Sequence, residues 1–205
     1  TGFEWMGGHA LFLGPNDIGI GKREAIKDIS RLFSRYNDII MARLFDHEHI
    51  LELAQFSTIP VINGLTDYNH PCQIVTDIFT VWEHLGEIDN PKIVYMGDGN
   101  NIVHSWLHLA MRIPMNFVCC CPEDYIPDQT TLNNAVDSKI SNIEISHTPN
   151  EAIKNADVVY IDVWASMGEE NDKEVKDAKF KGFTIDNNLI NEADEDAIVL
   201  HCLPA

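Results

Sequence analysis

Residues 92–101 read Lys-Ile-Val-Tyr-Met-Gly-Asp-Gly-Asn-Asn, and this stretch decides the fold class. The run 92–96 is short and apolar, which is typical of a buried strand, and two glycines then mark a tight turn. A segment with helical spacing of apolar residues opens at Asn101. A strand that turns directly into a helix is the unit from which parallel α/β sheets are built.

The same alternation of short apolar runs and helix-period segments extends along the whole chain. We expect strands at residues 9–13, 38–42, 59–62, 92–96, 116–120, 143–145, 158–161, 183–185 and 197–200. We expect helices at residues 23–34, 47–54, 71–84, 101–112, 128–138, 149–155, 173–179 and 187–192. The alternation predicts βαβ units and a parallel sheet.

One stretch stands out as a linker between domains. Residues 86–91 read Gly-Glu-Ile-Asp-Asn-Pro, a composition typical of a loop. We therefore predict an incomplete first domain at 1–88 and a second domain at 89–205. A helix at 71–85 would bridge the two.

The composition excludes several classes of partner. The 205 residues include 14 basic and 32 acidic side chains, for a formal net charge of −18. This charge argues against nucleic acid as a partner, because phosphate binding needs Lys and Arg. A solvated acidic surface explains the charge, although it would also favour the approach of a cationic substrate. No apolar run approaches the ~18 residues of a membrane span, so we expect no membrane partner.

The cysteines indicate a reducing compartment rather than a disulfide framework. Three of the five are consecutive, at 119–121, within an expected buried strand, where Cys behaves as a small apolar residue. The chain has no Cys-x-x-Cys pair and no Cys/His spacing typical of zinc. We therefore predict no metal site and a reducing compartment.

Two polar side chains are expected together at the start of the helix at 71–84. His70 precedes Pro71, a residue suited to the first turn of a helix, and Gln73 lies within that turn. A helix N-terminus attracts anions and polarised oxygens. His70 could therefore donate to a carbonyl oxygen while Gln73 accepts from an N–H of the same group. A capping or core-packed histidine is the alternative.

The glycine turn after residue 96 allows more than one reading. Gly97 and Gly99 match the first two positions of G-x-G-x-x-G, but Ile102 occupies the third. The third glycine of that motif permits close packing of helix and strand, so its absence weakens a dinucleotide site. Instead of a dinucleotide site, Asn100 and Asn101 could offer side-chain amides to a ligand at this strand end. A purely structural turn is the other alternative.

Two further strand ends carry charged side chains. Asp162 follows the strand at 158–161 and suits a substrate ammonium group, while Ser166 and the backbone after it could bind a carboxylate. Arg43 ends the strand at 38–42, and its planar guanidinium suits a phosphate or carboxylate. A helix cap, a solvated loop acid and a surface arginine are the alternatives.

The last strand leads into residues 201–205, His-Cys-Leu-Pro-Ala. Open α/β sheets bind ligands just beyond the carboxyl ends of their strands, which is where Cys202 is expected. His201 is not an obvious base for the thiol, because adjacent strand residues point to opposite faces. A binding or proton-handling thiol is therefore favoured over a covalent nucleophile.

Six motifs, in this order along the chain, resemble those of the ornithine carbamoyltransferases in the aspartate/ornithine carbamoyltransferase family. They are Gly-Gly-His at 7–9, Met-Ala-Arg at 41–43, His-Pro-Cys-Gln at 70–73, Gly-Asp-Gly-Asn-Asn at 97–101, Asp162 with Ser-Met-Gly at 166–168, and His-Cys-Leu-Pro at 201–204. The sequences at 14–17 and 61–69 are similar to those of plant and cyanobacterial members. The resemblance spans the whole chain. It implies two doubly wound, Rossmann-like parallel-sheet domains, the first incomplete, in a homotrimer.

The resemblance also implies roles for individual residues. Five residues would hold carbamoyl phosphate: Arg43, His70, Gln73, Cys202 and Leu203. Of these, Arg43, His70 and Cys202 would be catalytic. Ornithine would be held by Asn101, Asp162, Ser166 and Met167. The implied reaction transfers the carbamoyl group to the δ-amine of L-ornithine, giving L-citrulline and phosphate. It requires no cofactor.

The resemblance implies that parts of the family's site lie outside these residues. A Ser-x-Arg-Thr-Arg phosphate loop is expected before Thr1 and a further arginine after Ala205, so we expect the 205 residues alone to be inactive. Gly19 stands where many members have Gln. The location would be cytoplasmic for a bacterium and plastid for a plant or alga.

Three rival functions remain open at this point. A carbamoyltransferase for another amine, such as putrescine, is the nearest. A dinucleotide-dependent oxidoreductase would use Gly97 and Gly99, with Glu123 as a ribose partner. A non-catalytic homologue is the third.

Overall fold

The computed structural model describes residues 1–21, 23–87, 89–162, 164 and 173–203, which form two compact units. The first unit comprises residues 1–63 and the second residues 64–205. The division by contacts thus falls earlier than the break expected near residue 88. The reason is that the helix at 71–85 belongs to the second unit, where it packs against α6 (Asn101–Ala110) and β7 (Ile198–His201).

The first unit contains four helices and a two-stranded sheet within the described residues. Its helices are α1 (Gly2–Trp5), α2 (Pro15–Ile18), α3 (Ile26–Tyr36) and α4 (His47–Phe56). Strands β1 (Ile40–Arg43) and β2 (Val61–Leu65) pair with each other. Helices α3 and α4 pack together through a small core of buried residues that includes Ile29 and Leu53.

The second unit is built on a five-stranded sheet. In chain order its strands are β3 (Lys92–Met96), β4 (Asn116–Cys120), β5 (Asn142–Ser146), β6 (Val158–Ile161) and β7 (Ile198–His201). All neighbouring strands are parallel, and their spatial order is β5-β4-β3-β6-β7. The order reverses between β3 and β6, so the predicted doubly wound parallel sheet is confirmed here.

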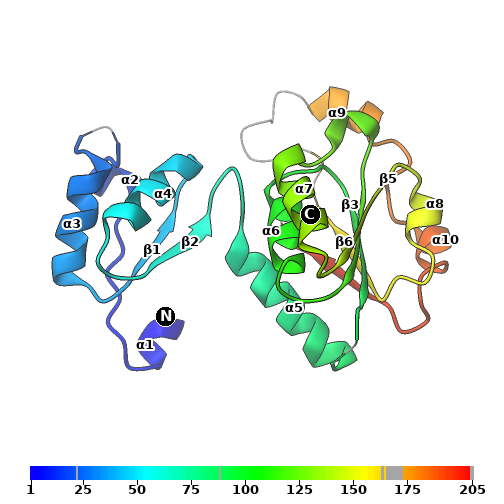
Figure 1. Cartoon of the computed structure of the whole chain (residues 1–205), viewed down its shortest axis with the longest axis horizontal. Coiled ribbons are helices and arrows are strands. Elements are labelled where there is room, and N and C mark those ends of the chain that lie inside the picture. Colours follow the sequence, from blue (N-terminus) through cyan, green and yellow to red (C-terminus); the bar gives the residue numbers. More distant parts are fainter. Residues whose placement is uncertain (22, 88, 163, 165–172, 204–205) are drawn as a thin grey trace. The chain divides into compact units, whose positions relative to one another are not determined.

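Helices cover both faces of this sheet, as Figure 1 shows. One face packs against α5 (Pro71–Leu85), α6 (Asn101–Ala110) and α7 (Gln129–Ser138). The opposite face packs against α8 (Pro149–Ala152), α10 (Asn187–Ile190) and the end of α9 (Lys173–Lys179), while a short 3-10 helix, η1 (Glu123–Tyr125), follows β4. The strand residues are buried on both faces because each face has its own helical layer.

The run of three cysteines confirms the structural interpretation. Cys119, Cys120 and Cys121 are fully buried, and they alternate between the two cores. Burial raises the pKa of Cys120 to about 12, so this thiol stays neutral. Among the described residues, no three His, Cys, Asp or Glu side chains are placed so that they could hold a metal ion together.

Two expected strands are wrong. Residues 9–13 form no strand, and Leu11 and Phe12 are exposed, without a partner strand among the described residues. Residues 183–185 are also irregular, because the sheet ends at β7. Phe183 is buried against Phe180, so its apolar character reflects core packing of a loop. Helix α3 begins at Ile26, three residues later than expected.

No helix in the described ranges has the length and apolar character that a bilayer crossing requires.

The second glycine of the turn after β3 has a structural explanation. The Gly99 N–H donates to the Tyr125 carbonyl at 2.9 Å. A Cβ atom at Gly99 would lie 2.5 Å from both the Ile126 carbonyl carbon and the Tyr125 oxygen, and would also contact the Pro127 nitrogen. The glycine is needed because backbone, which cannot rotate aside, occupies this space.

We predict that Gly99→Ala lowers the free energy of unfolding by at least about 1–3 kcal/mol, the usual cost of overpacking. Urea denaturation would measure it. Gly2→Ala is the matched control, because no atom lies within 4 Å of a Cβ there. Equal stability of the two variants would contradict the packing explanation.

Candidate functional site

The polar residues of the second unit converge where the strand order reverses. Strands β3 and β6 are neighbours, and the segments after them carry Asp98 and Asp162 respectively. Doubly wound sheets bind ligands in the crevice beyond the carboxyl ends of their strands at this switch point. The topology therefore makes this sheet edge the candidate site.

The Asp162 carboxylate is the centre of a hydrogen-bond cluster. It is only 5% exposed. The Cys202 thiol donates to its Oδ1 at 2.9 Å, and the Asn100 amide donates to its Oδ2 at 2.9 Å. The Tyr95 hydroxyl reaches Oδ2 at 3.3 Å. Three adjacent strands, β3, β6 and β7, thus bring these side chains to one carboxylate.

This arrangement keeps Cys202 in its thiol form. Burial raises the pKa of Cys202 well above its ordinary value, and the charge of Asp162 raises it further. A hydrogen bond with Tyr160 opposes the shift without reversing it. A thiolate nucleophile is disfavoured in this environment, because the thiolate would face a carboxylate across 2.9 Å.

A buried ion pair fastens helix α9 to the same sheet edge. The Lys176 ammonium lies 2.5 Å from the Asp98 carboxylate, and both side chains are largely buried. The ammonium also lies 5.3 Å from the centre of the Tyr125 ring, within range of a cation–π interaction. The Tyr95 hydroxyl donates to the Asp98 carbonyl at 2.8 Å, which connects this pair to the Asp162 cluster.

The loop before α5 is held by helix α6. The His70 N–H donates to the Ser105 hydroxyl at 2.7 Å, and that hydroxyl donates to the Asn101 carbonyl at 2.7 Å. The Asn101 amide donates to the Thr66 carbonyl at 3.0 Å. These bonds place His70 immediately before the first turn of α5, as the sequence predicted.

His104 ties this loop to helix α7. Its Nε2 accepts from the Asp128 N–H at 3.1 Å, so Nδ1 carries the proton and donates to the Tyr68 carbonyl at 2.8 Å. The Tyr68 ring packs against the imidazole, with centroids 5.0 Å apart. Burial lowers the pKa of His104, because the charged form is poorly solvated there and would also lose the bond from Asp128.

Gln73 and Tyr160 share a buried carboxylate. Gln73 Nε2 donates to Asp77 Oδ1 at 2.9 Å, and the Tyr160 hydroxyl donates to Asp77 Oδ2 at 2.8 Å. Burial raises the pKa of Asp77, while both hydrogen bonds act in the opposite direction. This cluster lies on the α5 face of the sheet.

The structure brings together only some of the predicted residues. Asp162 and Cys202 are in direct contact. Leu203 follows with an exposed side chain and a left-handed backbone (φ 53°), a conformation that is uncommon for a residue other than glycine. Its N–H donates to His201 Nδ1 at 2.8 Å.

Arg43 is an exposed residue at the end of β1 in the first unit. Ser166 and Met167 lie outside the described residues.

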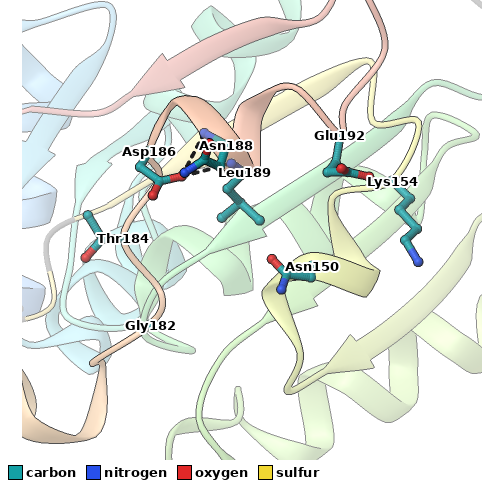
Figure 2. Close-up of a pocket in the computed structure, with 8 residues that line it drawn as sticks. All are labelled: Asn150, Lys154, Gly182, Thr184, Asp186, Asn188, Leu189 and Glu192. Carbon is teal, nitrogen blue, oxygen red and sulfur yellow. Dashed lines mark hydrogen bonds between the residues drawn. The ribbon is translucent and has the colours of Figure 1, made fainter.

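A separate cavity of about 590 Å³ lies elsewhere in the second unit (Figure 2). Its lining comes from α8, α10 and the loop between α9 and α10, and consists of Asn150, Lys154, Gly182, Thr184, Asp186, Asn188, Leu189 and Glu192. None of the predicted site residues lines it. The hydrogen-bond cluster at the switch point therefore remains the better candidate for chemistry.

Comparisons with known proteins agree with this topology and these motifs. Residues 1–83 match the carbamoyl-P binding domain of aspartate/ornithine carbamoyltransferase, and residues 89–205 match its Asp/Orn binding domain. The chain therefore belongs to the aspartate/ornithine carbamoyltransferase family.

Three similar proteins show which branch of the family this chain resembles. A chloroplastic ornithine carbamoyltransferase from Pisum sativum is 57% identical over 205 residues, which are 100% of this chain and 55% of that protein. The structure is similar to that of an ornithine carbamoyltransferase from Pyrococcus furiosus, with a TM-score of 0.90, 43% identity, and coverage of 98% of this chain and 65% of that one.

An anabolic ornithine carbamoyltransferase from Campylobacter jejuni gives a TM-score of 0.92 at 38% identity, covering 98% of this chain and 67% of that one. The chain thus spans about 55% to 67% of the length of these relatives.

Sequence reasoning missed four side chains that organise the site: Tyr95, Asp77, Tyr160 and Lys176. Tyr95 and Tyr160 lie within apolar strand segments, where the sequence pattern indicates only that an aromatic residue is part of the core. The spacing of Gln73 and Asp77, four residues apart on one helix, is a detectable signal, because such pairs face each other. Lys176 gave no local signal, since its partner Asp98 is 78 residues away.

We predict that iodoacetamide labels Cys202 at least about tenfold more slowly than an ordinary thiol near pH 8.5, because the thiolate is disfavoured. Mass spectrometry of the labelled peptide would give the rate, which should still rise between about pH 9 and 10. Asp162→Asn should accelerate labelling, since one cause of the raised pKa is removed. The exposed Asp137→Asn is the control, and a rate that levels off below pH 8 would contradict the prediction.

We predict that stability falls as the pH drops below about 6.5, the pKa of histidine in the unfolded chain. Because burial lowers the folded-state pKa of His104, the unfolded state binds more protons between the two pKa values. The contribution is fully present above the unfolded value and is lost as the pH falls toward the folded one. Urea denaturation at several pH values from 5 to 8 would measure the free energy of unfolding. This free energy should vary less with pH in His104→Gln than in the wild type. His84→Gln, which alters an exposed histidine, should leave the pH dependence unchanged.

Proposed function

We propose that this chain serves the transfer of the carbamoyl group from carbamoyl phosphate to the δ-amine of L-ornithine, giving L-citrulline and phosphate. The observation that carries the proposal is the 57% identity over all 205 residues to a protein named ornithine carbamoyltransferase. The two domain matches support a division in which residues 1–88 serve carbamoyl phosphate and residues 89–205 serve ornithine.

Carbamoyl phosphate would be bound by donors at the end of β1 and at the start of α5. The Arg43 guanidinium suits the phosphate and the carbonyl oxygen, because its planar fork donates several hydrogen bonds at once. His70 would donate to the carbonyl oxygen, where negative charge develops as the carbamoyl carbon becomes tetrahedral. Gln73 would accept from the carbamoyl amine.

Ornithine would be bound at the switch point. The buried Asp162 carboxylate suits the α-ammonium group, and Asn101, Ser166 and Met167 would complete the contacts to the amino-acid end. The Asp162 cluster supports this role, since its carboxylate is held in place by side chains from neighbouring strand ends.

The proposed mechanism relies on positioning. The δ-amine must lose a proton, attack the carbamoyl carbon and expel phosphate through a tetrahedral intermediate. A neutral Cys202 thiol and the backbone of Leu203 would seat the reacting amine, while the donors at the phosphate end stabilise the developing charge. No covalent enzyme intermediate is required.

The rival functions have less support. A dinucleotide site would need Gly99 for close approach of a pyrophosphate, yet the turn at residues 125–127 occupies that space. Ile102, at the third glycine position, is buried in the core. Putrescine as the amine would leave the residues assigned to the α-carboxylate without a partner.

The remaining family segments would supply what these residues lack. We infer that turnover requires the Ser-x-Arg-Thr-Arg loop and the later arginine expected from the family, and that the working form is a homotrimer. The pea relative, which is named chloroplastic, supports a plastid location if the source is a plant or alga. A bacterial source would imply the cytoplasm.

The proposal predicts citrulline formation by the full-length protein that contains these residues, and none by the 205 residues alone. A colorimetric citrulline assay with ornithine and putrescine offered separately would decide the substrate. Equal or faster turnover of putrescine would refute the assignment to ornithine.

The assignment of Arg43 predicts a separate result. Arg43→Ala should lower kcat/KM for carbamoyl phosphate by roughly 10²- to 10³-fold, the usual cost of removing a donor to developing charge. Arg35→Ala, which removes an exposed arginine on α3, should leave the rate unchanged. Similar rates for both variants would contradict the role of Arg43.

A further inference from the structure

Asp77 is a buried carboxylate outside the residues assigned to substrates. It lies in the second turn of α5 and is 7% exposed. Its two oxygens have different partners: Oδ1 accepts from Gln73 on the same helix at 2.9 Å, and Oδ2 accepts from Tyr160 on β6 at 2.8 Å. The carboxylate therefore joins a helix to the middle of the sheet.

The chemistry of a carboxylate dictates how both partners must face. An ionised carboxylate only accepts hydrogen bonds, so each neighbour must present a donor to it. Gln73 therefore turns its NH₂ group toward Asp77, and its carbonyl oxygen is the polar atom left for a ligand. The orientation of an amide is usually ambiguous, but an acceptor-only neighbour removes the ambiguity here.

Tyr160 is constrained in the same way on the other side. It has one hydroxyl proton, and Asp77 takes it, so the hydroxyl oxygen is left with its lone pairs. The ring is fully buried and packs against Tyr95 and Trp106, with centroids 5.9 and 5.7 Å away. A reversal of the Tyr160 hydroxyl would therefore break its bond to Asp77.

We propose that Asp77 is a positioning residue that orients Gln73 and Tyr160 together, and so fixes which atom of the Gln73 amide faces the carbamoyl group. Asp77 itself touches no substrate. The inference rests on the proposed function, because the Gln73 oxygen has a role only if a carbamoyl N–H is presented to it. Tyr160 is the second positioning residue of the pair.

Asp77→Asn tests the orientation with little change in shape. The asparagine side chain has one donor and one acceptor, so it satisfies only one neighbour in its present orientation. Either Gln73 or Tyr160 must then reverse. A reversed Gln73 would present NH₂ to the carbamoyl amine, a donor facing a donor.

The expected effect is a loss of roughly 10- to 100-fold in kcat/KM for carbamoyl phosphate in the full-length protein, as for other outer residues that orient a ligand-binding group. Glu83→Gln is the matched control, because it removes an exposed carboxylate from the same helix. It should leave kcat/KM unchanged.

Double-mutant cycles separate positioning from a structural role. If Asp77 acts through its neighbours, Asp77→Asn should cost much less in a Gln73→Ala or Tyr160→Phe background than in the wild type. A structural role would instead lower the melting temperature and give losses that add in both cycles. Additive losses in both cycles would overturn the proposal.

A readout without turnover distinguishes this inference from the proposed function. In the 205-residue chain, the ¹⁵N-labelled Gln73 side-chain NH₂ signals, assigned by their loss in Gln73→Ala, report the orientation of Gln73. The Tyr160 ring signals, assigned by their change in Tyr160→Phe, report the second neighbour of Asp77. Asp77→Asn should shift at least one of these sets, whereas Glu83→Gln should shift neither. Unchanged signals of both residues in Asp77→Asn would refute the positioning role.

The proposed function and the positioning role of Asp77 can each fail without the other. Shifted signals without citrulline formation by the full-length protein would refute the proposed function alone. Citrulline formation with additive cycles would refute the positioning role alone.

Discussion

The buried carboxylate of Asp162 is the interaction on which the candidate site depends. Its position follows from topology, since β3 and β6 become neighbours only because the chain reverses its winding direction there. A carboxylate taken out of water needs donors around it, and Cys202 and Asn100 supply them. The need to satisfy one charge therefore determines the arrangement of three strand ends.

The same physical rule applies again at Asp77, a second buried carboxylate. Because each carboxylate only accepts, the donors around it have no freedom of orientation. Tyr160 lies on β6, the strand that Asp162 follows, and the Cys202 thiol donates to Asp162. Two buried acids thus orient an amide, a phenol and a thiol, which is the kind of preorganisation that positioning chemistry requires.

Sequence reasoning was strongest where a pattern is local. The strands of the second unit and the N-terminus of α5 were predicted closely, because short apolar runs and Pro71 are local signals. The strand expected at 183–185 failed because burial of Phe183 in a loop resembles burial in a strand. The Asp77–Tyr160 and Asp98–Lys176 pairs were missed, since their members are 83 and 78 residues apart and meet only in the folded chain.

The raised pKa of Cys202 constrains the chemistry that this site can support. A thiol held neutral by burial and by an adjacent carboxylate is a poor nucleophile, but it can lie beside an uncharged amine at little electrostatic cost. A thiolate in the same place would stabilise the ammonium form and so oppose the loss of the proton that attack requires. Under the proposed function, the carboxylate assigned to the α-ammonium group of ornithine would therefore also help to keep the Cys202 thiol neutral beside the reacting amine.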